Sequence, residues 1–121
     1  MTPDPVQIYA LADSSPMVPI PGIEMRGVFG RGASINVVTI EAGAILPMHR
    51  HPHEQLGVVL EGILILTTED GDHEIGPDEA YVVPGNVEHA GTAGEGGCVV
   101  LDVFVPARDE YREAAAPPRT G

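Results

Sequence analysis

The sequence of 121 residues contains no lysine, no tryptophan and a single cysteine, Cys98. Without lysine, the chain has no side-chain amine that could form a Schiff base or anchor pyridoxal phosphate. One cysteine excludes an internal disulfide and a zinc site built from several thiolates. Because Cys98 lies in an apolar run with no activating neighbour, we interpret it as a packed thiol.

Positive charge is also scarce, since 6 arginines face 18 acidic residues and the net charge is −12. Such a chain repels phosphate backbones and anionic lipid surfaces, so neither nucleic acid nor membrane is expected as a partner. The longest apolar runs are far shorter than the ~20 residues that span a bilayer, and the first residues do not resemble a signal peptide. These features predict a cytoplasmic protein.

The length is typical of one domain, and a chain of this size buries roughly two-thirds of its unfolded surface, enough to fold without a structural metal. Residues 1–22 are rich in proline, which predicts an extended N-terminal arm. Residues 23–106 consist of short β-branched runs separated by glycine, proline and aspartate, a pattern typical of an all-β antiparallel sandwich or barrel. Residues 107–121 are expected to form a C-terminal tail with a short helix.

Two local patterns add detail to this all-β prediction. Asp70 and Gly71 suit the centre of a two-residue hairpin turn, where both positions need a positive φ, and this turn would pair residues 63–68 with the segment that contains His73. The runs at 58–60 and 99–101 are apolar on both faces of the expected strands. A second copy of the chain covering the outer face would explain this, so we expect a homodimer.

The histidines are placed where they could bind a metal ion. His49 and His51 alternate, and residues i and i+2 of a strand share a face, so both rings could point into a barrel. Pro52 then predicts a turn, after which Gln55 opens the next apolar strand and could return to the same point. His89 would have to come from a strand distant in the sequence. The alternative is a solvated polar loop, but these histidines interrupt apolar strands.

The same residues carry a resemblance to the cupin family. Residues 43–62, with His49, His51, Gln55 and a closing Gly62, are similar to the first cupin motif, and residues 84–89 are similar to the second, whose histidine completes a metal site. Gln55 stands where most cupins have glutamate, and Asn86 stands where they have glycine. The resemblance implies a double-stranded β-helix, a jelly-roll barrel, holding one metal ion.

A narrower resemblance is to the KdgF family of small pectin-degradation cupins. It is carried by residues 51–55 and by the segment 101–111, in which Asp102, Phe104 and Arg108 match the family's pattern. That family converts cyclic unsaturated uronates into open-chain keto acids. The resemblance implies a small acidic substrate and catalytic roles for these three residues.

The expected ligands have a chemical consequence of their own. Three neutral imidazoles and an amide would leave a divalent cation its full charge and make it a strong Lewis acid. Nitrogen and oxygen ligands without thiolate suit Ni, Zn, Mn, Fe or Co, and affinity order alone does not choose among them. The absent carboxylate argues against the two-histidine, one-carboxylate oxygenase site. It leaves three-histidine dioxygenases open.

Each of the other candidate residues has two interpretations. Asp102 interrupts an apolar strand, so either a partner holds it or it transfers a proton. Arg108 is either a clamp for a substrate carboxylate or an exposed arginine at the start of a helix. Phe104 is either a cavity wall or part of the core. His53 is expected at the rim of the site rather than as a ligand, and His73 on the hairpin surface.

Three functions follow from this sequence. The first is ring opening and ketonisation of an unsaturated uronate or related sugar acid, in which Asp102 moves the proton and Arg108 orients the carboxylate. The second is a metal-dependent dioxygenase, which would consume oxygen when loaded with iron. The third is a non-catalytic barrel that binds a small acid or a metal.

Overall fold

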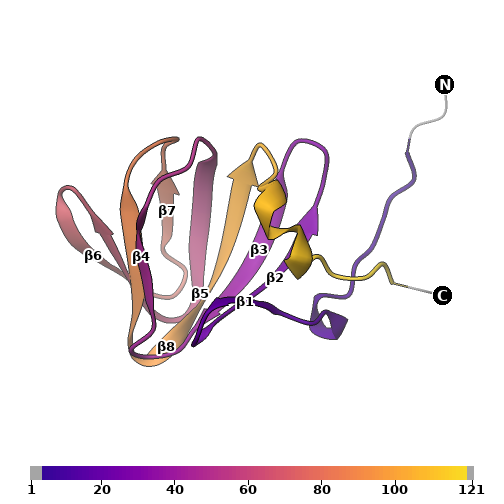
Figure 1. The fold of residues 1–121 in the computed structure, drawn as a ribbon. Coiled ribbons are helices and arrows are strands. Elements are labelled where there is room, and N and C mark those ends of the chain that lie inside the picture. The colour runs from indigo at the N-terminus through magenta and orange to yellow at the C-terminus, as the bar shows by residue number, and fades with distance from the viewer. Residues whose placement is uncertain (1–3, 120–121) are drawn as a thin grey trace.

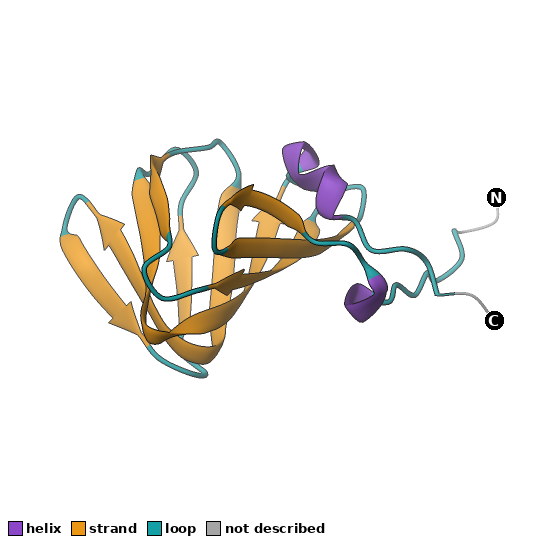
Figure 2. Ribbon diagram, turned by 60° about the horizontal axis from the view of Figure 1, so that its bottom comes forward, coloured by secondary structure: helices purple, strands orange, loops and turns teal. Residues whose placement is uncertain are grey.

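A computed structural model describes residues 4–119 of the chain. Its strands form one antiparallel sheet that curls into a barrel, with two short 3-10 helices outside it (Figures 1 and 2). The elements, in chain order, are η1 (Leu11–Asp13), β1 (Met17–Ile20), β2 (Ile23–Phe29), β3 (Ser34–Ile40), β4 (Ile45–His49), β5 (Glu54–Thr68), β6 (Gly71–Ile75), β7 (Ala80–Val83), β8 (His89–Val105) and η2 (Asp109–Ala114). The all-β prediction is confirmed. Among the described residues, no helix has the length and apolar character needed to cross a membrane.

The two longest strands, β5 and β8, form the spine of the barrel. They pair antiparallel along most of their length, with register shifts on both sides of Gly62. Gly62 has a φ of +74°, and a Cβ there would overlap the carbonyl oxygen of Gly97, so this crossing needs glycine. The first half of β5 pairs with β7 and the second half with β6, while β8 pairs with β4 and then with β3. Both long strands therefore pass from one part of the barrel to another.

The inward-facing residues form layers that run across neighbouring strands. An apolar layer consists of Met25, Val38, Val100 and Val59, which are register partners on β2, β3, β8 and β5. The next row toward the site is a polar layer made of Gly27, Asn36, Asp102, Gly57 and Tyr81, on β2, β3, β8, β5 and β7. The apolar layer belongs to the hydrophobic core, and the side chains of both layers contribute to the wall of the cavity described below.

The two ends of the chain differ in detail from the expected arm and tail. Within the expected arm, Met17–Ile20 pairs with β2 and is part of the sheet, and Tyr9 forms a bridge with Pro118. The arm therefore packs along its own domain and its tail, and both described ends lie on the same side of the barrel (Figure 1). The tail contains η2, whose nearest strand is β2. Residues 1–3 and 120–121 of these segments lie outside the described residues.

The hairpin forms one residue away from its predicted position. Thr68 pairs with Gly71, so the turn residues are Glu69 and Asp70 instead of Asp70 and Gly71. Gly71 has a φ of +112°, but Asp70 is not among the residues with positive φ. A single residue with positive φ directly after the turn is typical of a hairpin loop that closes with a β-bulge. That kind of loop needs only one glycine. His73 lies on this hairpin, exposed as predicted.

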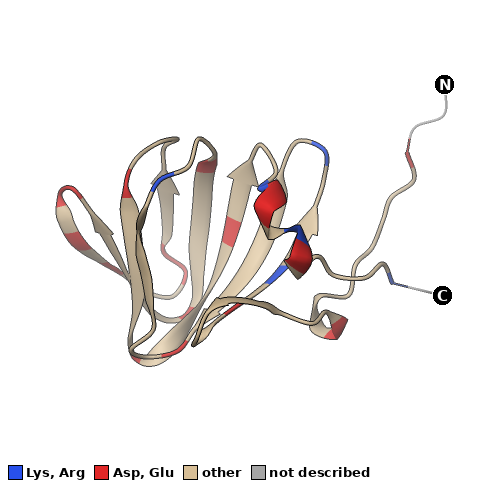
Figure 3. Cartoon of the chain, viewed as in Figure 1, with Lys and Arg blue, Asp and Glu red and all other residues tan. Residues whose placement is uncertain are grey.

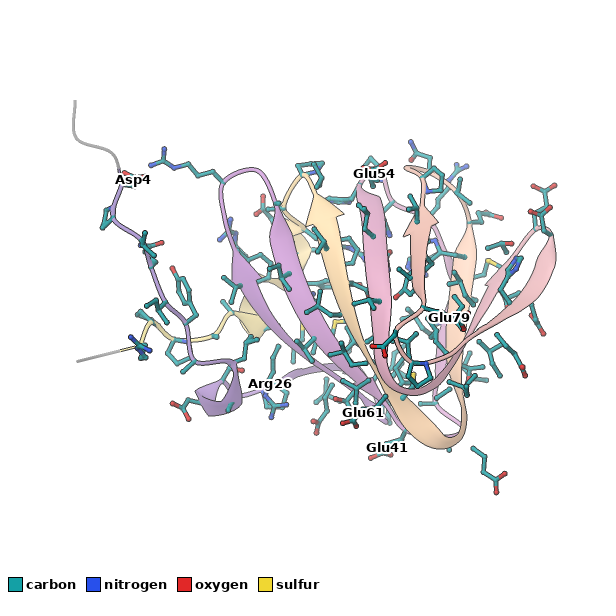
Figure 4. The ribbon with its side chains drawn as sticks, turned by 180° about the vertical axis from the view of Figure 1, so that it is seen from behind. Asp4, Arg26, Glu41, Glu54, Glu61 and Glu79 are labelled. Atoms are coloured by element: carbon teal, nitrogen blue, oxygen red, sulfur yellow. The ribbon has the colours of Figure 1, made fainter. Side chains whose placement is uncertain are left out.

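Acidic residues are spread over the strands, the loops and η2, while basic residues are few (Figure 3). Glu54, at the start of β5, marks one end of the barrel, and Glu41 and Glu61 lie at the opposite end (Figure 4). The histidines of the candidate site belong to the end that Glu54 marks, because His49 ends β4 and His89 begins β8.

Candidate active site

Three histidines converge at this end of the barrel. The nitrogen atoms through which His49, His51 and His89 could bind an ion all lie within 4.8 Å of one another. The ring centroids of His49 and His89 are 4.3 Å apart, because these residues are register partners on β4 and β8. The rings of His51 and His89 are 5.0 Å apart and perpendicular. These three side chains could hold a metal ion.

The local path of the chain at His51 differs from the prediction. His49 and His51 were expected on one face of a single strand, but β4 ends at His49, and His51 lies in the following loop. Pro52 explains this ending, since proline has no N–H and restricts the residue before it. A turn rather than strand alternation therefore brings the His51 ring beside its partners.

The backbone fixes which ring nitrogen of each histidine faces the shared centre. Nδ1 of His49 lies 2.8 Å from the carbonyl oxygen of Pro47, and Nδ1 of His89 lies 2.9 Å from that of Val87. Nδ1 of His51 is 3.0 Å from the carbonyl oxygen of the residue two positions later. A carbonyl only accepts, so each Nδ1 carries the hydrogen, and each neutral ring keeps the lone pair of Nε2 for a metal ion.

Gln55 supplies an oxygen atom at the same centre. It is 7 % exposed, and its Oε1 lies 3.1 Å from Nε2 of His51. Both atoms, Nε2 of His51 and Oε1 of Gln55, offer a lone pair to the other. A cation bound between them would accept both lone pairs. Divalent ions such as zinc bind nitrogen and oxygen ligands at about 2.0–2.2 Å, so one ion could contact both atoms. The donor set therefore fits a divalent transition metal.

Burial and nearby charge keep the rings of His51 and His89 neutral. Desolvation, together with Arg108 and His89, lowers the pKa of His51 to about 4. The pKa of His89 is also lowered, chiefly by burial and further by His49 and Arg108. At neutral pH, both rings are therefore unprotonated, the state in which imidazole binds a metal.

Asn86 positions the loop that carries His89. Its φ is +65°, a left-handed conformation that asparagine tolerates better than most residues other than glycine. Its backbone N–H donates a 2.7 Å hydrogen bond to the carbonyl oxygen of His51. The substitution of asparagine for the usual cupin glycine therefore preserves the turn and ties the two histidine segments together.

Asp102 lies in the polar layer, beside the histidines. It is 6 % exposed, and the hydroxyl of Tyr81 donates a 2.5 Å hydrogen bond to its Oδ1. Burial raises the pKa of Asp102 to about 6, against the opposing effects of Tyr81, the Gln55 amide and Arg108. The carboxylate thus has a partner and also lines the cavity, so the two interpretations of Asp102 are not exclusive.

Arg108 is buried at the edge of the same cavity, so the interpretation as an exposed arginine is wrong. It is 8 % exposed, and its Nε donates to Glu110 at 2.6 Å. Its guanidinium carbon lies 5.0 Å from the centroid of Phe104 and 4.1 Å from that of Tyr111. The backbone N–H of Arg108 also donates to Ser34 Oγ, which fixes the start of η2 against β3.

Phe104 lies between the histidines and Arg108. It is 3 % exposed, faces the cavity, and its ring lies 5.6 Å from that of His51. It thus serves as cavity wall and as part of the buried interior. His53 is outside the three-histidine cluster, with its ring 6.3 Å from that of Phe104.

Sequence reasoning missed three polar residues of the cavity, namely Asn36, Tyr81 and Tyr111. Asn36 interrupts an apolar strand in the same way as Asp102, so the signal that singled out Asp102 was also present there. Tyr81 carried no such signal, because its approach to Asp102 depends on Gly57 lying between them. Tyr111 reaches the cavity through the position of η2, which its sequence does not specify.

The fold and the histidine cluster together define a small single-barrel protein with a candidate metal centre. A family model described as a cupin domain matches residues 36–104, and the chain belongs to this family. No curated protein matches the sequence.

Among solved structures, KdgF from Halomonas sp. is 26% identical, with a TM-score of 0.78 over 85% of this chain and 97% of that one. An RmlC-like cupin from Shewanella frigidimarina is 20% identical, with a TM-score of 0.79 over 86% and 94% of the two chains. Oxalate decarboxylase from Bacillus subtilis, a protein with Mn(II) centres, is 19% identical, with a TM-score of 0.76 over 88% of this chain and 31% of that one. The protein is therefore a small cupin that resembles KdgF, and the other two likenesses show the fold alone.

Proposed function

We propose that this protein is a metal-dependent enzyme that opens and ketonises an unsaturated uronate or a related enolisable sugar acid. One observation carries the proposal: two members of the histidine cluster, His49 and His89, line the same cavity as a buried carboxylate and a buried guanidinium. The ion would be held by His49, His51, Gln55 and His89. When bound, it would stabilise negative charge on the substrate carboxylate and on the developing enolate oxygen.

The reaction is an isomerisation, so it needs no oxidant or reductant. A proton leaves the hydroxyl group of the hemiacetal carbon, the bond between that carbon and the ring oxygen breaks, and an aldehyde and an enolate form. The enolate becomes a ketone when its carbon takes up that proton. Asp102, with a pKa of about 6, can accept the proton from the hydroxyl group and deliver it to the carbon near neutral pH.

Arg108 orients the substrate by its carboxylate. A guanidinium binds a carboxylate through two parallel hydrogen bonds, and a local cation is needed in a protein whose net charge is −12. Glu110 and the ring of Tyr111 hold the guanidinium in place. Phe104, between Arg108 and His51, forms an apolar wall that keeps water from the reacting atoms.

The likeness to KdgF from Halomonas sp. supports this choice among cupin reactions, because it extends over nearly the whole of both chains. The residue pattern at Asp102, Phe104 and Arg108, through which the sequence resembles that family, supports the same choice. The two alternatives can be distinguished from this proposal by their products and reactants. A dioxygenase would consume oxygen, and a non-catalytic barrel would release no product.

The test is a comparison of the unmodified protein with His49→Ala and with His73→Ala, all purified without chelator or nickel resin. We expect one divalent ion per chain in the unmodified protein and in the His73 variant, and its loss in the His49 variant. Incubation with unsaturated galacturonate should give the open-chain keto acid by NMR only when the ion is present. Oxygen uptake by iron-loaded protein, or tight binding without product, would contradict the proposal.

We also propose that the enzyme is a cytoplasmic homodimer. The outer face of β3, β8, β5 and β7 carries an apolar row of register partners, Ile35, Val103, Leu56 and Val82. Leu56 is 40% exposed and Val82 58%, although both are apolar. A second copy covering this face would remove that surface from water. Light scattering should give twice the chain mass, and Leu56→Glu should give monomers.

A further inference from the structure

Asn36 carries a buried amide group that the protein does not use to hold its own fold. The residue is 0 % exposed, and among the described residues neither Nδ2 nor Oδ1 has a hydrogen-bond partner. Nearly all buried polar side chains in folded proteins are paired, so an unpaired one requires an explanation. Asn36 lines the cavity of the candidate active site, next to its register partner Asp102.

The surrounding sheet makes room for this amide. Gly27 is the register partner of Asn36 on β2, and a Cβ at Gly27 would lie 2.6 Å from Oδ1 of Asn36. Any other residue at position 27 would therefore push the amide out of its place. The polar layer thus leaves space for the hydrogen-bond donor and acceptor of the Asn36 amide. This amide lies on the strand next to Asp102, the residue that we propose as the proton carrier.

The chemistry of the amide points to the group that it would bind. Nδ2 donates and Oδ1 accepts, and a hydroxyl group both accepts and donates, so one hydroxyl can satisfy both atoms. A carboxylate fits less well because it would face the amide oxygen, and Arg108 already offers a cation to that group. An apolar group would leave both atoms unpaired.

We infer that Asn36 is a specificity-determining residue that binds a ring hydroxyl group of the substrate. The substrate class is then a polyhydroxylated acid, and simple keto acids or dicarboxylates of similar size are poor ligands. This inference rests on the proposed function for the reaction itself, but it also makes a prediction about binding that does not depend on turnover.

The variant that tests it is Asn36→Leu, because leucine has a similar branched shape and no polar atoms. Thr39→Val is the matched control, since it removes a hydroxyl from the outward face of the same strand. We expect the Asn36 variant to keep its metal content and its melting temperature. Its kcat/KM for unsaturated galacturonate should fall by about 10²-fold or more, as when a site built for a hydroxyl group loses that contact.

Analogues of the substrate separate specificity from general damage. For one of the 2-deoxy and 3-deoxy forms of the unsaturated uronate, Asn36→Leu should lower kcat/KM by less than about threefold, because the hydroxyl that Asn36 contacts is already absent. An equal loss for all three compounds, or loss of the metal, would show a structural role and overturn the inference. So would an unchanged kcat/KM for the complete substrate.

A binding experiment separates this inference from the proposed reaction. Calorimetry with saturated galacturonate and with cyclohexanecarboxylate, both unreactive acids, measures recognition without chemistry. We expect Asn36→Leu to weaken galacturonate binding at least tenfold and to leave cyclohexanecarboxylate binding unchanged. If this result holds while no uronate is turned over, the reaction is wrong and the hydroxyl contact stands. If neither acid binds, or both bind equally to the two proteins, the inference fails.

Discussion

The hydroxyl of Tyr81 reaches Oδ1 of Asp102 across an intervening strand, with an oxygen-to-oxygen distance of 2.5 Å. Tyr81 lies on β7 and Asp102 on β8, and Gly57 of β5 is the register partner of both. The phenol passes over Gly57 because that residue has no side chain. The protonation of Asp102 therefore depends on a tyrosine and a glycine from two other strands.

Replacing Tyr81 with phenylalanine removes the hydrogen bond that holds the pKa of Asp102 down toward about 6. Hydrogen bonds to charged groups contribute about 1.5–3 kcal/mol, so the pKa should rise by about one unit or more. If ionised Asp102 starts the reaction, the acid limb of kcat/KM against pH moves upward by the same amount, with little change above both pKa values. Tyr9→Phe is the control, and an acid limb that stays in place would contradict this role.

Replacing Gly57 with alanine should disturb the same pair by steric overlap. A Cβ at this position would overlap Cζ and the hydroxyl of Tyr81 and would crowd Oδ1 of Asp102. Overpacking of this kind costs about 1–3 kcal/mol of unfolding free energy, and activity should fall with it. Gly32→Ala is the control because an added Cβ meets nothing within 4 Å there. In a Tyr81→Ala background, urea denaturation should show a smaller cost for Gly57→Ala, and an equal cost would show that Tyr81 is not the obstacle.

Replacing Asp102 with asparagine should stabilise the protein at alkaline pH. The pKa of Asp102 rises on folding from 3.8 to about 6, so ionisation costs folding free energy as pH rises between these values. The polar groups around position 102 are the same in the unmodified protein and in the variant, namely the amides of Asn36 and Gln55, Tyr81 and Arg108. The comparison therefore reports the charge of Asp102. We expect chelator-treated Asp102→Asn to be more stable at pH 8, by up to about 3 kcal/mol, and equally stable near pH 4. Urea denaturation between pH 4 and pH 8 measures this difference in unfolding free energy. A variant that is less stable than the unmodified protein at pH 8 would contradict the prediction.

Replacing Gln55 with glutamate should improve metal binding and impair the reaction. A carboxylate ligand cancels one unit of the cation's charge, which raises affinity and weakens the Lewis acid. It also places a second negative charge beside Asp102 and raises the pKa of that residue. We expect slower loss of the ion to a competing chelator together with a kcat reduced by about 10-fold or more. Gln7→Glu is the control, and a lower metal affinity would show that Gln55 does not face the ion.

The candidate metal ligands were accessible to sequence reasoning because they stand beside apolar runs at the spacing of the cupin motifs. Imidazoles at His49, His51 and His89 are costly to bury without a function, so their positions indicate a site before any fold is known. The same reasoning applied to Asp102 and could have been applied to Asn36. It could not show that β4 ends before His51, or that Arg108 is buried, since both depend on where the following segments pack.

The sequence by itself determined the all-β class, the inward alternation of β8 and the identity of the donors, because period-two patterning and side-chain chemistry are local properties. Only the tertiary structure decided which nitrogen of each histidine faces the centre, and that Asn36, Asp102 and Tyr81 form one layer. These facts depend on the register between strands far apart in the sequence. A shift of one residue in that register would turn the same side chains to the opposite face of the sheet.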